Sequence, residues 1–172
     1  MVRALVAEAD IVVEGFRPGV MARLGLGYDD LKTINPRLVY CSITGFGQHG
    51  PLADKAGHDI TYQSHAGVTG QNVIDGSRPS PGGVPIADLA GGSLTSAVGI
   101  LAALFDAQRT GEGRHIDIAM TDAAMALNVA AQSSRETFGG RDPQPGRDIL
   151  SGGLPCYNTY RTADGRYLAV GA

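Results

Sequence analysis

The feature of this 172-residue sequence that most constrains its fold is an early alternation of strand-forming and helix-forming segments. Residues 11–13 are the β-branched run Ile-Val-Val, and residues 38–43 form a second apolar run. Between them the pattern predicts two short helices, over residues 18–25 and 29–34, with Pro18 in the first turn of the former. This β–α–β order predicts an α/β fold with an open parallel sheet and flanking helices.

The remainder of the chain extends this pattern and predicts a second, smaller part. We expect helices over residues 59–68, 88–108 and 121–134, a loop over 72–85 and a strand over 115–118. The long helix has one face of large apolar residues that includes Leu94, Val98, Leu101, Ala102 and Phe105. Strand patterns at 157–160 and 167–170, around Ala163-Asp164-Gly165, predict a hairpin.

These elements predict the domain organisation. Residues 1–135 are expected to belong to a large domain, 136–155 to a linker, and 156–172 to the start of a small α+β domain. The first residues have the pattern of a helix end, and the last have that of a strand with no further partner after it. We therefore expect an interior part of a longer protein; the alternative is a small complete domain with frayed ends.

Composition excludes several classes of function. The chain is 43% apolar and 18% charged, with a net charge of −3, so bulk charge indicates neither a nucleic-acid nor a membrane partner. Cys41 and Cys156 are far apart in sequence, which argues against a disulfide framework or a zinc site and favours a reducing cytoplasm.

Residues 45–50 match the pattern G-x-G-x-x-G directly after a predicted strand. A dinucleotide site would need a helix that opens on the third glycine, and Pro51 follows instead. We therefore reject a dinucleotide fingerprint here. A glycine-rich turn at the carboxyl end of a strand can still form a wall of a ligand site.

His58 is the histidine with the most informative surroundings. It stands between Gly57 and Asp59 at a predicted loop-to-helix junction, where a helix N-terminus disfavours the imidazolium and lets a neutral ring act as a base. A lone histidine is more often structural or exposed. His65 follows seven residues later, but a metal pair prefers closer spacing and a third ligand, so no metal site is predicted.

Asp88 stands at the start of the most apolar helix. The simple interpretation is an N-cap. Its apolar neighbours also allow partial desolvation of the carboxyl group, which would raise its pKa toward the range useful for proton transfer. Arg17, Arg23 and Arg37 are either exposed charges or, if they meet near strand ends, contacts for an anionic ligand.

A set of motifs resembles the family III CoA-transferase (CaiB/BaiF) superfamily over essentially the whole chain. The motifs are E-G-F-R-P-G at 14–19, R-L-G-L-G at 23–27, N-P-R-L-V-Y at 35–40, S-I-T-G-F-G at 42–47, and Asp88 followed by G-I-L-A-A-L at 99–104. The resemblance implies a Rossmann-like large domain that binds CoA, a small domain, and an interlocked homodimer in full-length members. It also implies acyl-CoA thioester substrates and no metal or redox cofactor, because coenzyme A enters as part of the substrate. Family members begin with a further βα segment and continue beyond the last strand of this chain.

Two chemistries compete within this superfamily. In the transferases, an aspartate at the position of Asp88 is the covalent nucleophile. In the alpha-methylacyl-CoA racemase branch, the same aspartate pairs with the histidine of a G-H-D-I-N-Y motif, which residues 57–62 match with Thr61 in place of Asn. The stretches 152–155, 157–160 and 163–167 are also similar to the racemase branch.

The resemblance therefore predicts racemisation of 2-methylacyl-CoA thioesters through an enolate, with His58 and Asp88 as the two acid/bases. Transfer of CoA between carboxylic acids is the alternative, and an inactive CoA-binding or structural piece is a third. The predicted substrate and CoA contacts are Arg17, Arg23, Gly57, Asp59, Ile60, Thr61 and Tyr62.

Overall fold

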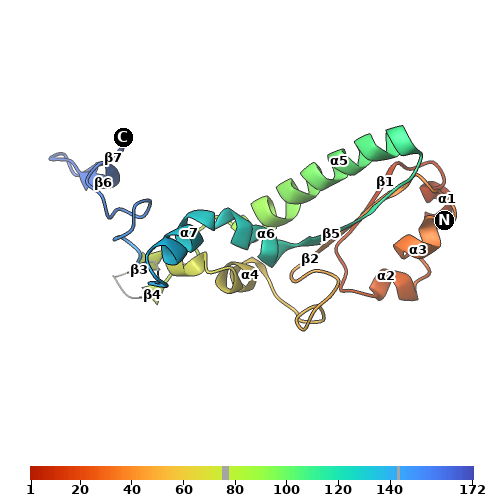
Figure 1. Ribbon diagram of the computed structural model, residues 1–172, viewed down its shortest axis with the longest axis horizontal. Helices are drawn as coiled ribbons and strands as arrows, with labels where there is room; N and C mark the ends of the chain where they lie inside the picture. Colours follow the sequence, from red (N-terminus) through yellow and green to blue (C-terminus); the bar gives the residue numbers. More distant parts are fainter. Residues whose placement is uncertain (75–77, 143) are drawn as a thin grey trace.

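The computed structural model of the protein describes residues 1–74, 78–142 and 144–172. At its centre is a three-stranded parallel sheet of order β1-β2-β5, made of β1 (Ile11–Glu14), β2 (Val39–Thr44) and β5 (His115–Ala119). Figure 1 shows these strands running side by side beneath the long helix α5. The predicted α/β fold with an open parallel sheet is confirmed, and the carboxyl ends of all three strands meet at one edge.

One face of the sheet is covered by a helix whose most deeply buried contact residues are small. This helix begins as the π-helix η2 (Ala87–Leu94) and continues as α5 (Thr95–Thr110). Ala103 and Ala107 are buried against Val39, and a Cβ placed on Gly99 would lie 3.2 Å from Ile116 Cγ2. Small residues thus let the helix axis approach the sheet closely.

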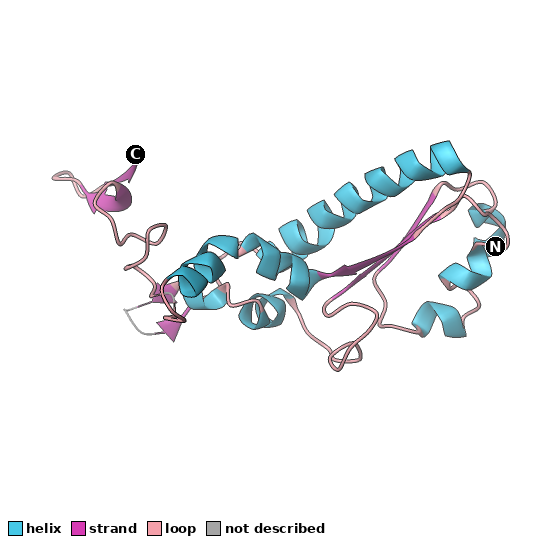
Figure 2. Ribbon diagram, viewed as in Figure 1, coloured by secondary structure: helices cyan, strands magenta, loops and turns pink. Residues whose placement is uncertain are grey.

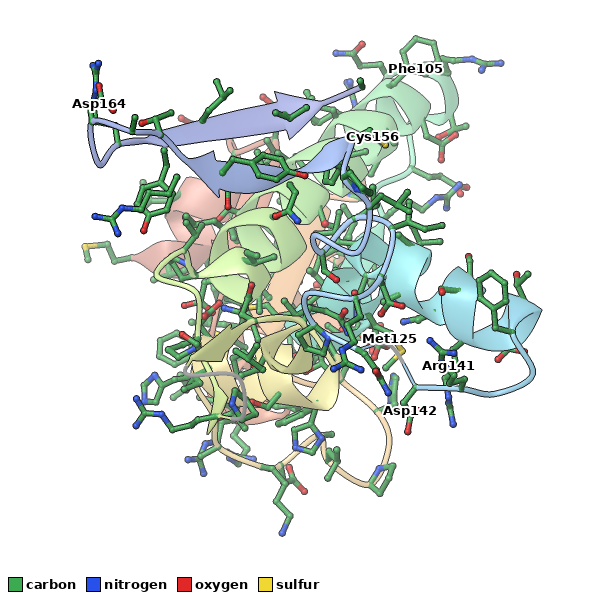
Figure 3. The ribbon with its side chains drawn as sticks, turned by 90° about the vertical axis from the view of Figure 1, so that its left-hand side faces the viewer. Phe105, Met125, Arg141, Asp142, Cys156 and Asp164 are labelled. Carbon is green, nitrogen blue, oxygen red and sulfur yellow. The ribbon has the colours of Figure 1, made fainter. Side chains whose placement is uncertain are left out.

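Two large apolar residues of α5, Ile100 and Leu104, also pack on the sheet side, half-buried against the same cluster. Four others of the η2–α5 helix lie on its other side. Leu94, Val98, Leu101 and Phe105 are 63–69% exposed, and Ala102 is exposed as well. Figure 3 shows the Phe105 side chain projecting away from the ribbon. Periodicity predicted this face, but it is not the one that packs on the sheet.

The opposite face of the sheet is covered by three short helices, α1 (Val2–Val6), α2 (Val20–Arg23) and α3 (Tyr28–Leu31). Their core is a cluster of Val6, Leu31, Leu38 and Tyr40. The predicted place of Pro18 in the first turn of a helix is wrong. Gly19 adopts a left-handed conformation with φ of 78°, so α2 begins only after it.

A second group of helices lies beyond the carboxyl ends of the strands. It consists of α4 (Asp59–His65), the 3-10 turn η1 (Thr69–Gln71), α6 (Met120–Leu127) and α7 (Val129–Thr137). The single helix predicted over 121–134 is interrupted at Asn128, whose amide Nδ2 donates to the Ala66 carbonyl at 3.2 Å. That bond ties α6 to the end of α4.

Two antiparallel pairs complete the fold. β3 (Val73–Ile74) pairs with β4 (Arg78–Pro79) inside the predicted loop 72–85, so the loop prediction is wrong for these four residues, and residues 75–77 lie outside the described part. β6 (Tyr157–Arg161) and β7 (Tyr167–Gly171) form the predicted hairpin. Figure 2 shows this hairpin at the end of the molecule opposite the N-terminus.

By length and composition, the helix over Ala87–Thr110 could cross a membrane. The core helix of a soluble protein passes the same test, and the small-residue side of this helix packs on β2 and β5. The expectation of no membrane partner therefore stays a prediction.

Candidate active site

His58 lies at the start of α4, as its sequence context predicts. It is the N-cap residue, with extended backbone angles of φ −132° and ψ 172°. Its carbonyl accepts hydrogen bonds from the N–H groups of Thr61 at 2.8 Å and Tyr62 at 3.2 Å. The side chain is exposed, so the imidazole is open to a ligand at the first turn of α4.

Asp88 lies in the first turn of η2, and its side chain is also exposed. The N-cap interpretation is wrong, because the helix begins one residue earlier, at Ala87, after Ile86 in the N-cap position. Asp88 instead belongs to the helix proper. The wide π geometry of this segment matches a class of helical distortion that occurs frequently at functional sites.

Asp59 connects the two helix starts. Its Oδ1 accepts hydrogen bonds from the backbone N–H of Ala87 at 2.9 Å and of Asp88 at 3.1 Å. Its Oδ2 accepts a bond from the side-chain amide of Gln63. The residue that follows His58 in sequence therefore bonds to the main chain of Asp88, and the two predicted acid/base residues belong to adjoining helix starts.

The charges around Asp88 act in opposite directions on its carboxyl group. Burial of the group raises the pKa of Asp88, the negative charge of Asp59 raises it further, and positive charge on His58 lowers it. The net shift is upward, as the apolar flanks predict. Asp88 consequently keeps its proton to a higher pH than an ordinary aspartate does.

Tyr62 lies beneath the site and packs against two glycines. A Cβ placed on Gly45 would lie 2.1 Å from Tyr62 Cε1, and one placed on Gly57 would lie 2.6 Å from the same atom. The edge of the ring meets Phe46 with centroids 5.4 Å apart. Gly45 was predicted only as part of a ligand wall, and its role in admitting this ring depends on a contact 17 residues away that no local pattern reveals.

A cavity of about 200 Å³ opens beside Tyr62 at the carboxyl edge of the sheet. Its wall includes residues that directly follow the three strands, namely Gly15, Gly45 and Met120, which is where ligands of open α/β sheets bind. Two cationic side chains, Arg17 and Lys55, also line it. Lys55 was not singled out from the sequence, where a single lysine in a loop carries no distinguishing pattern.

Four of the predicted substrate and CoA contacts lie at the cavity or at the junction of the two helix starts. Arg17, Gly57 and Tyr62 line the cavity, and Asp59 lies at the His58–Asp88 junction. Burial and the charge of Asp88 raise the pKa of Tyr62 while Arg17 lowers it, so Arg17 and Asp88 both act on this hydroxyl.

The other predicted contacts lie outside the cavity wall. Thr61 is half-buried on α4, Ile60 is 49% exposed on the same helix, and Arg23 is exposed on α2. Arg37 precedes β2, whereas Arg17 follows β1, so in this parallel sheet the two arginines lie at opposite edges. The suggestion that all three arginines converge is therefore wrong.

Within residues 1–74, 78–142 and 144–172, no group of three or more His, Cys, Asp or Glu side chains is arranged to hold a metal ion. His65 contacts the Phe46 ring edge-on, with centroids 5.3 Å apart. The glycine-rich turn at 45–50 is followed by further turns and not by a helix, in agreement with the rejection of a dinucleotide fingerprint.

All 172 residues match the family described as CoA-transferase family III, and the chain belongs to this family. It is 42% identical over 172 residues to alpha-methylacyl-CoA racemase of Homo sapiens, an alignment that covers 100% of this chain and 45% of that protein. It is 43% identical over 172 residues to succinate–glutarate CoA-transferase of Agrobacterium fabrum, covering 99% of this chain and 42% of that protein. The resemblance inferred from the motifs is confirmed.

A solved structure of a CAIB/BAIF family protein from Brucella suis has the same fold. The TM-score is 0.86 at 37% sequence identity, over 99% of this chain and 44% of that one. The chain thus spans less than half the length of the relatives it matches. Because a racemase and a transferase are equally similar, overall identity does not choose between the two activities.

Proposed function

We propose that the protein is an acyl-CoA racemase that inverts 2-methylacyl-CoA thioesters by 1,1-proton transfer. The thioester carbonyl acidifies the α-hydrogen. His58 removes that proton from one enantiomer to give an enolate, and protonated Asp88 returns a proton to the opposite face of the same carbon. Each turnover leaves His58 protonated and Asp88 ionised, and proton exchange of the two side chains with water restores the starting state. In the reverse direction the two residues exchange roles.

The observation that carries the proposal is the junction of α4 and η2. Asp59, next to His58, accepts a hydrogen bond from the N–H of Asp88 at 3.1 Å, so the two acid/base residues project from adjoining helix starts. The upward pKa shift of Asp88 supports the same proposal, because a general acid must retain its proton near the working pH.

The enolate needs hydrogen-bond donors, and we propose that the first backbone N–H groups of α4 supply them. The first N–H groups of a helix have no partner inside it. The N–H groups of Thr61 and Tyr62 donate to the His58 carbonyl, so those of Asp59 and Ile60 are the candidates. Gly91 is a poorer choice, because it is buried and a Cβ there would lie 2.8 Å from the Met120 carbonyl oxygen. We further propose that Arg17 and Lys55, which line the cavity, attract the CoA phosphates, with Arg23 a more distant contact. Coenzyme A is then part of the substrate and not a cofactor.

The second candidate is transfer of CoA between carboxylic acids through a covalent intermediate on Asp88. The exposed carboxyl group and the 43% identity to a CoA-transferase favour it. The presence of His58 beside Asp88 favours the racemase, because covalent transfer on an aspartate has no need of a second base facing the substrate carbon.

An exchange experiment separates the two candidates. The intact protein is incubated with a 2-methylacyl-CoA in deuterated water, and deuterium at the α-carbon is measured by mass spectrometry. We expect the wild-type protein to incorporate deuterium from either enantiomer. His58→Ala and Asp88→Asn should each lose about 10²–10⁴-fold in rate with the enantiomer whose proton the missing residue removes. His49→Ala, in the exposed loop after β2, is the matched control and should exchange normally.

The opposite result would identify a transferase. A CoA adduct on Asp88, trapped by borohydride and located by peptide mass spectrometry, together with no deuterium at the α-carbon, would contradict the racemase.

We also propose that the protein acts as a homodimer and that residues 1–135, 136–155 and 156–172 are the large domain, the linker and the start of the small domain.

A further inference from the structure

We infer that Asp59, held by Gln63, is a positioning residue that fixes Asp88 relative to His58. The inference rests on the proposed function to the extent that both residues act on one substrate carbon. Neither the racemase nor the transferase chemistry assigns a task to the Asp59 carboxylate itself.

Both carboxylate oxygens of Asp59 accept hydrogen bonds. Asp59 is the first residue of α4, and its Oδ1 accepts hydrogen bonds from the backbone N–H groups of Ala87 and Asp88. The first N–H groups of a helix have no partner within it, so a carboxylate from another helix satisfies two of them here. Ile86, in the N-cap position of η2, has no side-chain oxygen that could accept from these N–H groups. The carboxylate of Asp59, on α4, therefore caps the N-terminus of η2.

The buried side chain of Gln63 holds the second carboxylate oxygen of Asp59. This side chain is fully buried one helical turn after Asp59, and its Nε2 donates to Asp59 Oδ2 and to the Val84 carbonyl, the latter at 3.3 Å. Both partners are acceptors, so the orientation of the amide is fixed. Val84 lies on the segment that leads into η2, and Gln63 consequently holds both Asp59 and the entry to the helix that carries Asp88.

The cost of this arrangement supports a role beyond packing. Gln63 Oε1 is buried with no hydrogen-bond partner among the described residues. Burying such an oxygen is unfavourable, whereas an apolar side chain of similar size would carry no such penalty. The amide is needed because only a donor can hold the second oxygen of Asp59 and leave the first free for the two backbone N–H groups.

Two Asp59 variants separate the hydrogen bonds from the charge. Asp59→Asn keeps one oxygen to accept hydrogen bonds from the Ala87 and Asp88 N–H groups, but removes the negative charge and the oxygen that accepts from Gln63. Asp59→Ala removes both. Gln63→Leu keeps the volume and removes the amide, and Asp10→Ala, an exposed residue at the start of β1, is the control.

The first measurement needs no substrate. Amide hydrogen exchange of Ala87 and Asp88 is followed by NMR in each variant. We expect Asp59→Ala to speed exchange at both amides by about tenfold or more. Gln63→Leu and Asp59→Asn, which both lose the bond between Gln63 and the second oxygen, should speed it less, and the control should leave it near wild type. Unchanged protection in Asp59→Ala would overturn the inference.

The second measurement is the pH profile of α-proton exchange by the intact protein. For Asp59→Ala we expect kcat to fall about tenfold or more with KM within about threefold, because the substrate contacts remain while the reacting groups are misplaced. For Asp59→Asn we expect a smaller fall in kcat than for Asp59→Ala, because only the Gln63 bond is lost. The loss of protonated Asp88 should move to lower pH, because removing the neighbouring negative charge lowers the pKa of Asp88.

The outcomes distinguish the two proposals. A raised KM with unchanged kcat in Asp59→Ala would make Asp59 a substrate contact and would overturn the inference. If wild-type protein fails to exchange the α-proton, the racemase proposal fails alone, because amide protection at Ala87 and Asp88 still decides whether Asp59 holds Asp88 in place.

Discussion

At the scale of single residues, the site depends on how closely Tyr62 approaches the main chain. The ring fills the space that side chains at positions 45 and 57 would need. Tyr62 is 7% exposed and belongs to the core cluster that also contains Ala87, the residue before Asp88. Packing of this one ring thus joins the end of β2, the loop before His58 and the start of η2.

This close approach predicts a large effect for a small substitution. Gly45→Ala should lower the free energy of unfolding by about 1–3 kcal/mol, because the new methyl group overlaps the Tyr62 ring and a packed core relaxes only partly. Urea denaturation followed by circular dichroism measures the change. Gly70→Ala, where a Cβ meets nothing within 4 Å, is the control and should be neutral or slightly stabilising. Equal stabilities for the two variants would refute this account of Gly45.

The sequence revealed some of these residue roles and not others. His58 at a loop-to-helix junction was predictable, because Gly57 breaks the preceding structure and a helical pattern follows. The task of Asp59 was not, because its partners are 28 and 29 residues away, and the N-cap was therefore assigned to Asp88 instead. Local patterns identify a helix start, but not a cap that comes from another helix.

At the scale of elements, the helix formed by η2 and α5 has two apolar sides of different size. The side with Gly99, Ala103 and Ala107, flanked by half-buried Ile100 and Leu104, packs on the sheet. The side with Leu94, Val98, Leu101 and Phe105 is exposed. The sequence predicted the helix and its large apolar face. It did not predict which side packs, because the periodicity records where apolar residues lie and not how closely the helix approaches the sheet.

Substitutions on the two sides of α5 should differ in effect. Ala103→Leu should destabilise the protein by about 1–3 kcal/mol, because Ala103 is 8% exposed and packs against Val39. Leu101→Gln, at a position 66% exposed, should change the free energy of unfolding of this chain by less than about 0.5 kcal/mol. Thermal unfolding by calorimetry compares them. A larger loss for Leu101→Gln would mean that the exposed side is covered in solution.

At the scale of the whole molecule, the open parallel sheet and the hairpin followed from the sequence. The strand order and the place of the hairpin relative to the sheet did not. Parallel strands separated by helices predict one sheet with its carboxyl ends at a single edge, and the cavity is found there. The hairpin is a local structure that its turn residues specify, and it lies at the end opposite the N-terminus (Figure 1). The chain spans less than half the length of its relatives, so the dimer and the domain boundaries remain proposals.

If His58 and Asp88 serve opposite faces of one carbon, exchange from each pure enantiomer must depend on a different one of the two residues. Deuterium incorporation by the intact protein is measured separately for the two 2-methylacyl-CoA enantiomers. His58→Ala should lose exchange from one enantiomer and keep it from the other, and Asp88→Asn should show the reverse preference. Equal loss from both enantiomers in both variants, or full exchange in either variant, would contradict a mechanism with one base on each face.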